Sequence, residues 1–252
     1  MAYPYVMTER SVAITIDRKT YNFTDSHPHW ASIRSAIRNR KWLRVEALVD
    51  IVRAMRKFTH GQIQFKNGEV FFREKPLHNV VTDRIIRLQH EGEKFKPLVR
   101  FLDKLMHNPS ESAQAELYLF MEAANLPITP DGDFLAFKRV NDDYTSVHQS
   151  PDGTHVNNAV GKTVRMARGS CDADREKLCS EGLHICGAGY LPDYSGARVV
   201  ICKINPKDVV SVPSDHGNEK ARVCAYKVVG ELGVDFTDAD MTKALTRLKK
   251  AA

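Results

Sequence analysis

Two adjacent cations interrupt an apolar segment in the second half of the chain. Lys138 and Arg139 lie within FLAFKRV, residues 134–140. A charged group inside an apolar strand is costly unless it has a partner. One of the two is therefore expected to bind a phosphate or carboxylate in a cleft. The alternatives are pairing with Asp142 or Asp143, or a position at an open sheet edge.

A histidine and a second pair of cations have the same alternating pattern. In GLHIC, residues 182–186, Leu183 and Ile185 share one strand face and His184 takes the other. His184 is a candidate for contacting a ribose hydroxyl or a base, or for acid–base work. The alternative is a buried structural histidine. Lys220 and Arg222 would share a face and add a second anion contact.

Aromatic side chains in predicted loops are candidates for stacking on a base. We single out Tyr144 and Tyr190, with His148 and Tyr194 nearby in the same loops. Peripheral packing is the alternative for all four rings. We assign no catalytic residue.

Metal and cysteine chemistry are not supported. The chain lacks the paired, closely spaced cysteines of zinc knuckles among Cys171, Cys179, His184 and Cys186. We therefore expect neither a metal nor a cofactor. Five cysteines and a beginning without an apolar signal core favour reduced thiols in a cytosol. No apolar run approaches the roughly 20 residues of a membrane span.

The net charge of +6 and isoelectric point near 9.0 permit binding to polyanions without proving it. Basic residues are concentrated within residues 34–57. They form either the solvent-exposed face of a helix or a surface that binds nucleic acid or nucleotide phosphates. The members that would contact nucleic acid are Arg34, Arg38, Arg44, Arg53 and Arg56.

Hydrophobic periodicity supplies the elements that must position these residues. Residues 11–23 alternate as two strands, and QIQFKNGEVFF predicts a β-hairpin around Asn67-Gly68. Helical patterns follow at residues 82–91, 97–107 and 109–124. Asn108 is the expected cap of the last one, with Pro109 at its first position and Glu111 completing a capping box.

The chain is predicted to be α+β with two domains. Two prolines and a glycine in NLPITPDGD punctuate the chain after residue 126. We place an N-terminal domain with the hairpin and helices at residues 1–126 and a strand-rich mixed domain at 127–252. The second domain should carry the ligand site.

Several blocks also resemble a known family. NLPITPDGDFLAFKRVNDDY, CSEGLHICGAGYLPDY and ARVVICKINPKDVVSVPSD, with NGEVFFREKPLHNVVTDRI upstream, are similar to the rIIB-like (rapid-lysis) accessory proteins of tailed phages. The resemblance covers nearly the whole chain. It implies a phage protein in the cytoplasm of the infected bacterial host, where the family is associated with resisting host exclusion. No defined reaction comes with it.

A weaker similarity concerns the second half alone. The order of LAFKRV, GLHICGAGYLPDY and ARVVICKI is similar to small ADP-ribosyltransferase-like domains over about 90 residues. Those enzymes need an acidic residue near the last strand, and here Glu219 lies before that strand among cations. This departure favours a fold that binds a nucleotide over one that reacts with it.

The sequence therefore predicts a phage accessory protein that counters host exclusion or defence by binding a host component, such as a nucleotide-derived signal. A nucleic-acid-binding protein, a nucleotide-modifying or nucleotide-cleaving enzyme, and a scaffold for a host or phage protein are the alternatives. The oligomeric state stays open.

Overall fold

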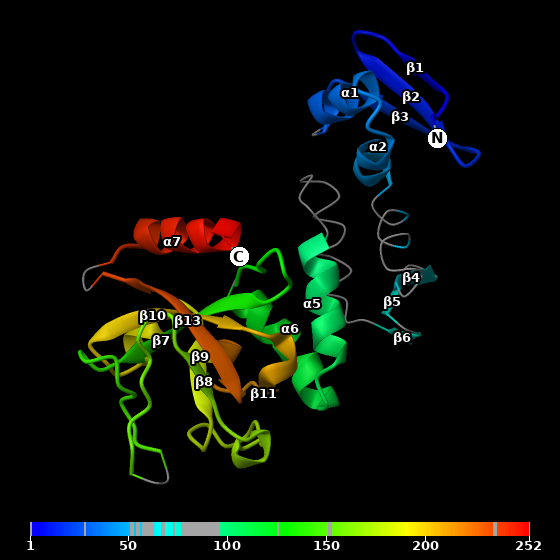
Figure 1. The fold of residues 1–252 in the computed structure, drawn as a ribbon. Helices are drawn as coiled ribbons and strands as arrows, with labels where there is room; N and C mark the ends of the chain where they lie inside the picture. Colours follow the sequence, from blue (N-terminus) through cyan, green and yellow to red (C-terminus); the bar gives the residue numbers. More distant parts are fainter. Residues whose placement is uncertain are drawn as a thin grey trace. The chain divides into compact units, whose positions relative to one another are not determined.

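The computed structural model describes residues 2–27, 29–50, 53, 56, 63–66, 69–72, 74–76, 96–124, 126–150, 153–233 and 236–251. The chain divides into two compact units, residues 1–96 and 97–252. Both contain helices and strands (Figure 1), so the predicted α+β class is confirmed. None of the described helices is long and apolar enough to cross a membrane.

Unit 1, residues 1–96, begins with a three-stranded antiparallel sheet covered by two helices. Alternate residues of the middle strand, Val12, Ile14 and Ile16, are buried against Ile33 and Val45 of the helices. The elements are β1 (Tyr5–Met7), β2 (Ser11–Ile16), β3 (Lys19–Thr24), α1 (Trp30–Arg38), α2 (Trp42–Val49), β4 (Ile63–Lys66), β5 (Glu69–Phe72) and β6 (Lys75–Pro76).

The predicted strands of unit 1 are confirmed. β2 and β3 pair antiparallel within residues 11–24, and β4 pairs with β5 as the hairpin requires. The Asn67-Gly68 turn and the helix expected at 82–91 lie outside the described residues.

Unit 2, residues 97–252, is built on a seven-stranded antiparallel sheet in the order β11-β12-β9-β7-β10-β13-β8. Its elements are α5 (Lys96–Met106), α6 (Glu111–Ala123), β7 (Phe134–Val140), β8 (Thr163–Arg165), β9 (Leu183–Cys186), β10 (Arg198–Ile204), β11 (Val209–Ser211), β12 (Lys220–Val223), β13 (Ala225–Leu232) and α7 (Asp238–Ala251). Short 3-10 helices span Arg168–Ser170, Leu191–Asp193, Pro206–Asp208 and His216–Asn218.

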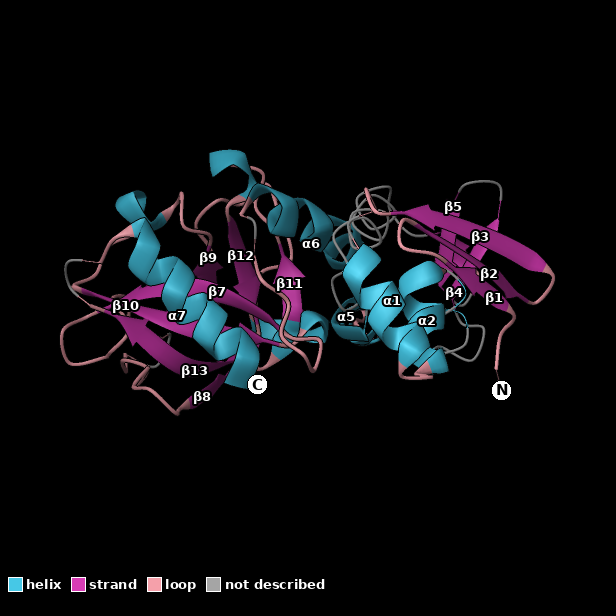
Figure 2. Cartoon of the chain, turned by 90° about the horizontal axis from the view of Figure 1, so that it is seen from above, coloured by secondary structure: helices cyan, strands magenta, loops and turns pink. Residues whose placement is uncertain are grey.

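The two faces of the central strand β7 pack against different helices. Leu135 and Phe137 join the apolar cluster that contains Met241 of α7, which lies across the sheet (Figure 2). Phe134 points to the other face, with ring centroids 6.4 Å from Phe101 of α5 and 6.3 Å from Phe120 of α6. α5 and α6 therefore belong with the sheet, and unit 2 begins before the boundary predicted after residue 126.

The cap of α6 differs from the prediction. Helix α6 begins at Glu111, and the Ser110 hydroxyl accepts the Ala113 amide at 3.2 Å, so Ser110 is the capping residue. The Asn108 side chain accepts the Ser110 amide and donates to the carbonyls of Pro206 and Val209. Asn108 therefore fastens the helix entry to the turn before β11.

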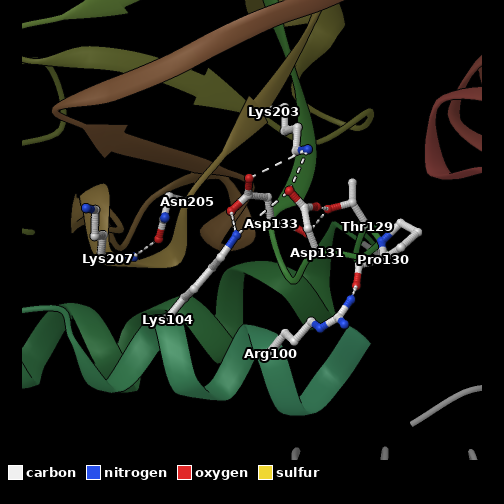
Figure 3. Close-up of polar contacts among 9 residues, drawn as sticks. All are labelled: Arg100, Lys104, Thr129, Pro130, Asp131, Asp133, Lys203, Asn205 and Lys207. Carbon is white, nitrogen blue, oxygen red and sulfur yellow. Dashed lines mark hydrogen bonds and ion pairs between the residues drawn. The ribbon is translucent and has the colours of Figure 1, made fainter. Parts of the chain in front are cut away.

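The proline-rich segment predicted as a boundary is a charged turn inside unit 2. Lys104 Nζ lies 2.6 Å from Asp133, and Lys203 Nζ lies 2.8 Å from Asp131 (Figure 3). The Arg100 guanidinium donates to the Pro130 carbonyl at 2.7 Å. The turn thus holds α5, the start of β7 and β10 together.

Candidate ligand-binding pocket

The central strands β7 and β9 separate after a single paired position. Phe137 pairs with Cys186, and continuing that register would set Arg139 opposite His184. Instead the His184 carbonyl accepts Lys138 Nζ at 3.1 Å and the Tyr194 hydroxyl at 3.3 Å. The Lys138 and Tyr194 side chains thus take the place of backbone hydrogen bonds between β7 and β9. The pocket lies where these two strands separate.

The pocket has a volume of about 420 Å³. Sites that bind small molecules commonly enclose about 300–1,000 Å³, and the volume of this pocket falls within that range. Its walls come from both strands, the segment after β7, the segment before β9 and the 3-10 helix near Asp193. The lining includes Lys138, Arg139, Ser146, His148, Gln149, Cys179, Ser180, Glu181, His184, Tyr190, Asp193, Tyr194, Lys220 and Tyr226.

Lys138 is the most unusual group in the lining. Its residue is 8% exposed, and Nζ donates to the Tyr194 hydroxyl at 3.1 Å as well as to the His184 carbonyl. No carboxylate among the described residues lies within 4 Å of it. Burial raises the pKa of both Tyr194 and Tyr226, so these phenols are neutral at neutral pH. The ammonium charge is therefore solvated by dipoles and rings without being neutralised.

His184 supplies a neutral polar edge. Burial lowers the pKa of His184 to about 3, and the charges of Lys138 and Arg222 act in the same direction. Its Nε2 is buried and has no hydrogen-bond partner within the described part of the chain. A neutral imidazole with one free ring nitrogen can accept or donate one hydrogen bond, according to its tautomer.

Lys220 and Tyr190 form a second group in the lining. Lys220 Nζ lies 5.5 Å from the centroid of the Tyr190 ring and 2.6 Å from Asp215 Oδ2. The ring also packs edge-on against His216, with centroids 4.7 Å apart. Lys220 therefore already has a carboxylate partner, unlike Lys138.

Arg139 lines the pocket, but its guanidinium is engaged elsewhere. Its Nε donates to the Leu191 carbonyl at 2.9 Å and its Nη1 to the Gly196 carbonyl at 3.1 Å. These contacts fix the loop that carries Tyr190 and Tyr194. Arg139 thus shapes the wall, whereas the Lys138 ammonium lies in the lining without a carboxylate partner among the described residues.

Two of the predicted ligand contacts lie outside the pocket lining. The Tyr144 hydroxyl donates to Glu231 at 2.6 Å, and its ring lies under the Arg198 guanidinium. Arg222 is fully buried and donates to Ser211 Oγ and to the carbonyls of Lys177 and Asp174. Arg222 thereby holds the segment before β9, which forms one wall.

The lining also contains Tyr194 and Tyr226. Tyr194 is one of the loop rings named as candidates for stacking, whereas Tyr226, which lies in a largely apolar strand, is not among the predicted ligand contacts. The Tyr226 hydroxyl donates to the buried Asn158 side chain. The hydroxyl of a tyrosine buried in an apolar strand needs a polar partner. This need is the one sequence signal that could have identified Tyr226 as a residue of the site.

The basic residues of unit 1 have varied surroundings. Arg53 pairs with Asp17, and Arg34 donates to the Glu9 carbonyl while lying over the Trp30 ring. Arg38 and Arg44 are exposed. Arg56 contributes to a small cavity that also contains Asp17 and Asp50.

The ADP-ribosyltransferase-like similarity stays a prediction. No solved structure matches the chain. The carboxylate of Glu219 lies so close to Gly189 that a Cβ there would meet its Oε2 at 2.2 Å, and Glu219 is not in the pocket lining. In the described part of the chain, no three His, Cys, Asp or Glu side chains are placed to hold a metal ion.

Comparison with known proteins identifies the family. The family model described as Bacteriophage T4 protein rIIB matches residues 37–235. Protein rIIB of Enterobacteria phage T4 is 33% identical over 232 residues, which cover 91% of this chain and 73% of that protein. Because both matches span most of the chain, the protein belongs to the phage T4 rIIB family and is a phage accessory protein, as its sequence blocks predict.

Proposed function

We propose that the pocket between β7 and β9 binds an anionic, nucleotide-derived molecule of the bacterial host. By sequestering this signal in the cytoplasm of the infected cell, the protein would counter host exclusion or defence. Membership of a phage family supports the setting. The chemistry of the pocket supports the ligand class.

The observation that carries the proposal is the buried ammonium of Lys138 without a carboxylate partner. Burying an unpaired charge is expensive, and the charge stays costly until an anion joins it. A phosphate oxygen would accept a short charge-assisted hydrogen bond from Nζ. Lys138 is thus assigned to the phosphate.

The remaining groups suit the rest of a nucleotide. The free Nε2 of His184 fits a ribose hydroxyl or a polar edge of a base, because the imidazole is neutral at pH 7. Tyr190 offers a ring against which a base can stack. Lys220 adds a second anion contact only if it shares its charge with Asp215.

A thermal-shift screen with mononucleotides, cyclic nucleotides and dinucleotides tests the proposal. A ligand at one hundred times its Kd stabilises the folded state by about 2.7 kcal/mol. The Lys138→Met variant should lose the shift. The matched control is Lys227→Met, which removes an exposed lysine from β13 of the same sheet and should keep it. Absence of stabilisation by every nucleotide at millimolar concentration contradicts the proposal.

A second measurement separates sequestration from turnover. After long incubation, the bound nucleotide should be recovered unchanged by chromatography. Formation of a product from NAD or a cyclic nucleotide that stops in the His184→Gln variant would show an enzyme instead.

A further inference from the structure

Four cations surround the junction between α1 and α2 in unit 1. Arg38 lies in the last turn of α1, Arg40 and Lys41 form the connection, and Arg44 lies in the first turn of α2. All four side chains are exposed, and none forms an ion pair or side-chain hydrogen bond with another residue that the structure describes. We call them the junction cations.

The junction cations differ from their neighbours in the same basic stretch. Arg53 is neutralised by Asp17, and Arg34 is held by a carbonyl and a tryptophan ring. The first turn of α2 contains no acidic residue. Among the described residues of this stretch, the positive charge without an ion-pair partner is therefore concentrated at the junction.

Aromatic rings lie directly beside these cations. The Trp42 ring packs against Tyr5 at 6.1 Å and edge-on against Tyr3 at 5.9 Å. Tyr5 of β1 is 46% exposed, and Leu43, next to Trp42 in α2, is 82% exposed. The exposed Tyr5 ring, the half-buried Trp42 ring and the Leu43 side chain thus interrupt the positive surface.

A hollow of about 590 Å³ lies at this junction and includes three of the junction cations together with Trp42 and Leu43. It is lined by Tyr3, Arg40, Lys41, Trp42, Leu43, Arg44 and Glu46. The single acid in this lining, Glu46, is only 4% exposed, so it presents almost no charge to solvent. The surface offered to a partner is therefore cationic and aromatic.

We propose that this surface binds single-stranded nucleic acid. Proteins that hold single strands combine a positive groove along the phosphates with aromatic rings on which bases stack. A duplex would satisfy the cations but would leave the rings unused, because its bases are stacked inside. An acidic peptide would likewise use the charge and not the flat rings. The site lies within unit 1 and does not depend on the pocket of unit 2.

Fluorescence anisotropy with a short labelled oligothymidylate, titrated on the full chain at several salt concentrations, tests the inference. Each phosphate contact on a single strand contributes about 0.7 to the slope of log K against log salt. The Lys41→Gln/Arg44→Gln variant should therefore reduce the slope by about 1.4 and weaken binding about 20-fold near 0.1 M salt. The control Arg10→Gln/Lys19→Gln removes two exposed cations outside the hollow and should change neither value.

Stacking gives a readout that charge alone would not move. The oligonucleotide should quench the emission of Trp42. The Trp42→Leu variant should lose that quenching and bind about tenfold more weakly with an unchanged salt slope. The other tryptophan of the chain, Trp30, remains in this variant as an internal reference.

The outcomes are distinct. Salt-dependent binding with Trp42 quenching, with the affinity weakened in the two hollow variants and unchanged in the control, supports the inference. Tighter binding of duplex or of polyglutamate than of the single strand, or equal losses in the control variant, overturns it. So does binding that leaves Trp42 emission unchanged.

Discussion

The two ends of β7 differ in whether their buried or half-buried charges have partners of opposite sign. Just before the strand, Asp131 and Asp133 face Lys104 and Lys203, so two negative groups meet two positive ones (Figure 3). Near its far end, Lys138 is surrounded by a carbonyl and phenol groups. The first network is balanced and the second carries an excess charge.

The difference distinguishes a network of ion pairs that stabilises the fold from a site that is suited to binding a ligand. Burial opposes ionisation of Asp131, yet hydrogen bonds from Lys203 and Thr129 lower its pKa to about 2. Every charge there already has its counterion within the fold, so a ligand would gain little. Lys138 has no carboxylate partner among the described residues, and this contrast is the reason for our proposal that a ligand binds at that end.

The largest effect is expected where the balanced network depends on backbone geometry. Gly132 has φ +86°, and a Cβ there would lie 2.5 Å from the carbonyl carbon of Arg100. Gly132→Ala should cost more than about 3 kcal/mol in urea unfolding, because strain and a backbone clash add. Gly153 has φ +79°, but a Cβ there would meet no atom of the described residues within 4 Å, so Gly153→Ala should cost about 1 kcal/mol. Equal losses would show that the close approach to α5 is unimportant.

Removing one lysine from each end should give opposite results. Lys104→Met leaves the Asp133 carboxylate without its nearest cation and should destabilise the protein by about 2 kcal/mol. Lys138→Met removes an unneutralised buried charge, while the His184 carbonyl keeps the Tyr194 hydroxyl as donor. The ligand-free variant should therefore unfold at the same or a higher temperature. A loss as large as that of Lys104→Met would mean that Lys138 is structural.

Lowering the pH should reduce the stability of the folded protein, because His184 is buried as a neutral imidazole. Its pKa of about 3 in the folded state lies below the unfolded value of about 6.5, so the unfolded chain binds more protons between these limits. Stability is lost as the pH falls through this window, by about 2 kcal/mol at pH 5 for this group. The His184→Gln variant lacks the loss, so its unfolding free energy relative to the wild type should rise between pH 7.5 and pH 5. A constant difference would contradict the neutral buried imidazole.

The smallest effect is expected at Asp131. Its side chain is 46% exposed, and Asp133 remains 3.8 Å from Lys203, so Asp131→Asn should cost about 1 kcal/mol or less at pH 7. Because the folded pKa lies below the unfolded value, the wild-type advantage is present above about pH 4 and disappears toward pH 2. Urea unfolding of both proteins across this range measures it. An advantage that grows in acid would reverse our assignment of the carboxylate.

The strands of unit 2 could be predicted from local alternation, whereas the division of the chain could not. Prolines and a glycine around residue 130 indicate a break in secondary structure, and there is one. Whether that break is a linker or a turn depends on Lys104 and Lys203, which lie far away along the chain. Local composition carries no information about such partners.

The candidate site shows the same limit. Lys138 and His184 were predicted because polar groups stand out within apolar strands. Tyr144 and Arg222 had equally suggestive types, but Glu231 and the Lys177 carbonyl occupy them. The parting of β7 and β9, which creates the pocket, is a matter of pairing between strands and leaves no mark in either strand alone.

The separation of β7 and β9 also affects how the family can diversify. Since the His184 carbonyl is held by the tips of Lys138 and Tyr194, the width of the opening is set by side-chain length and not by the course of the main chain. Shorter or longer residues at these two positions would resize the chamber while the sheet order stayed the same. Under the function proposed above, such substitutions would change the size of ligand that the pocket can admit.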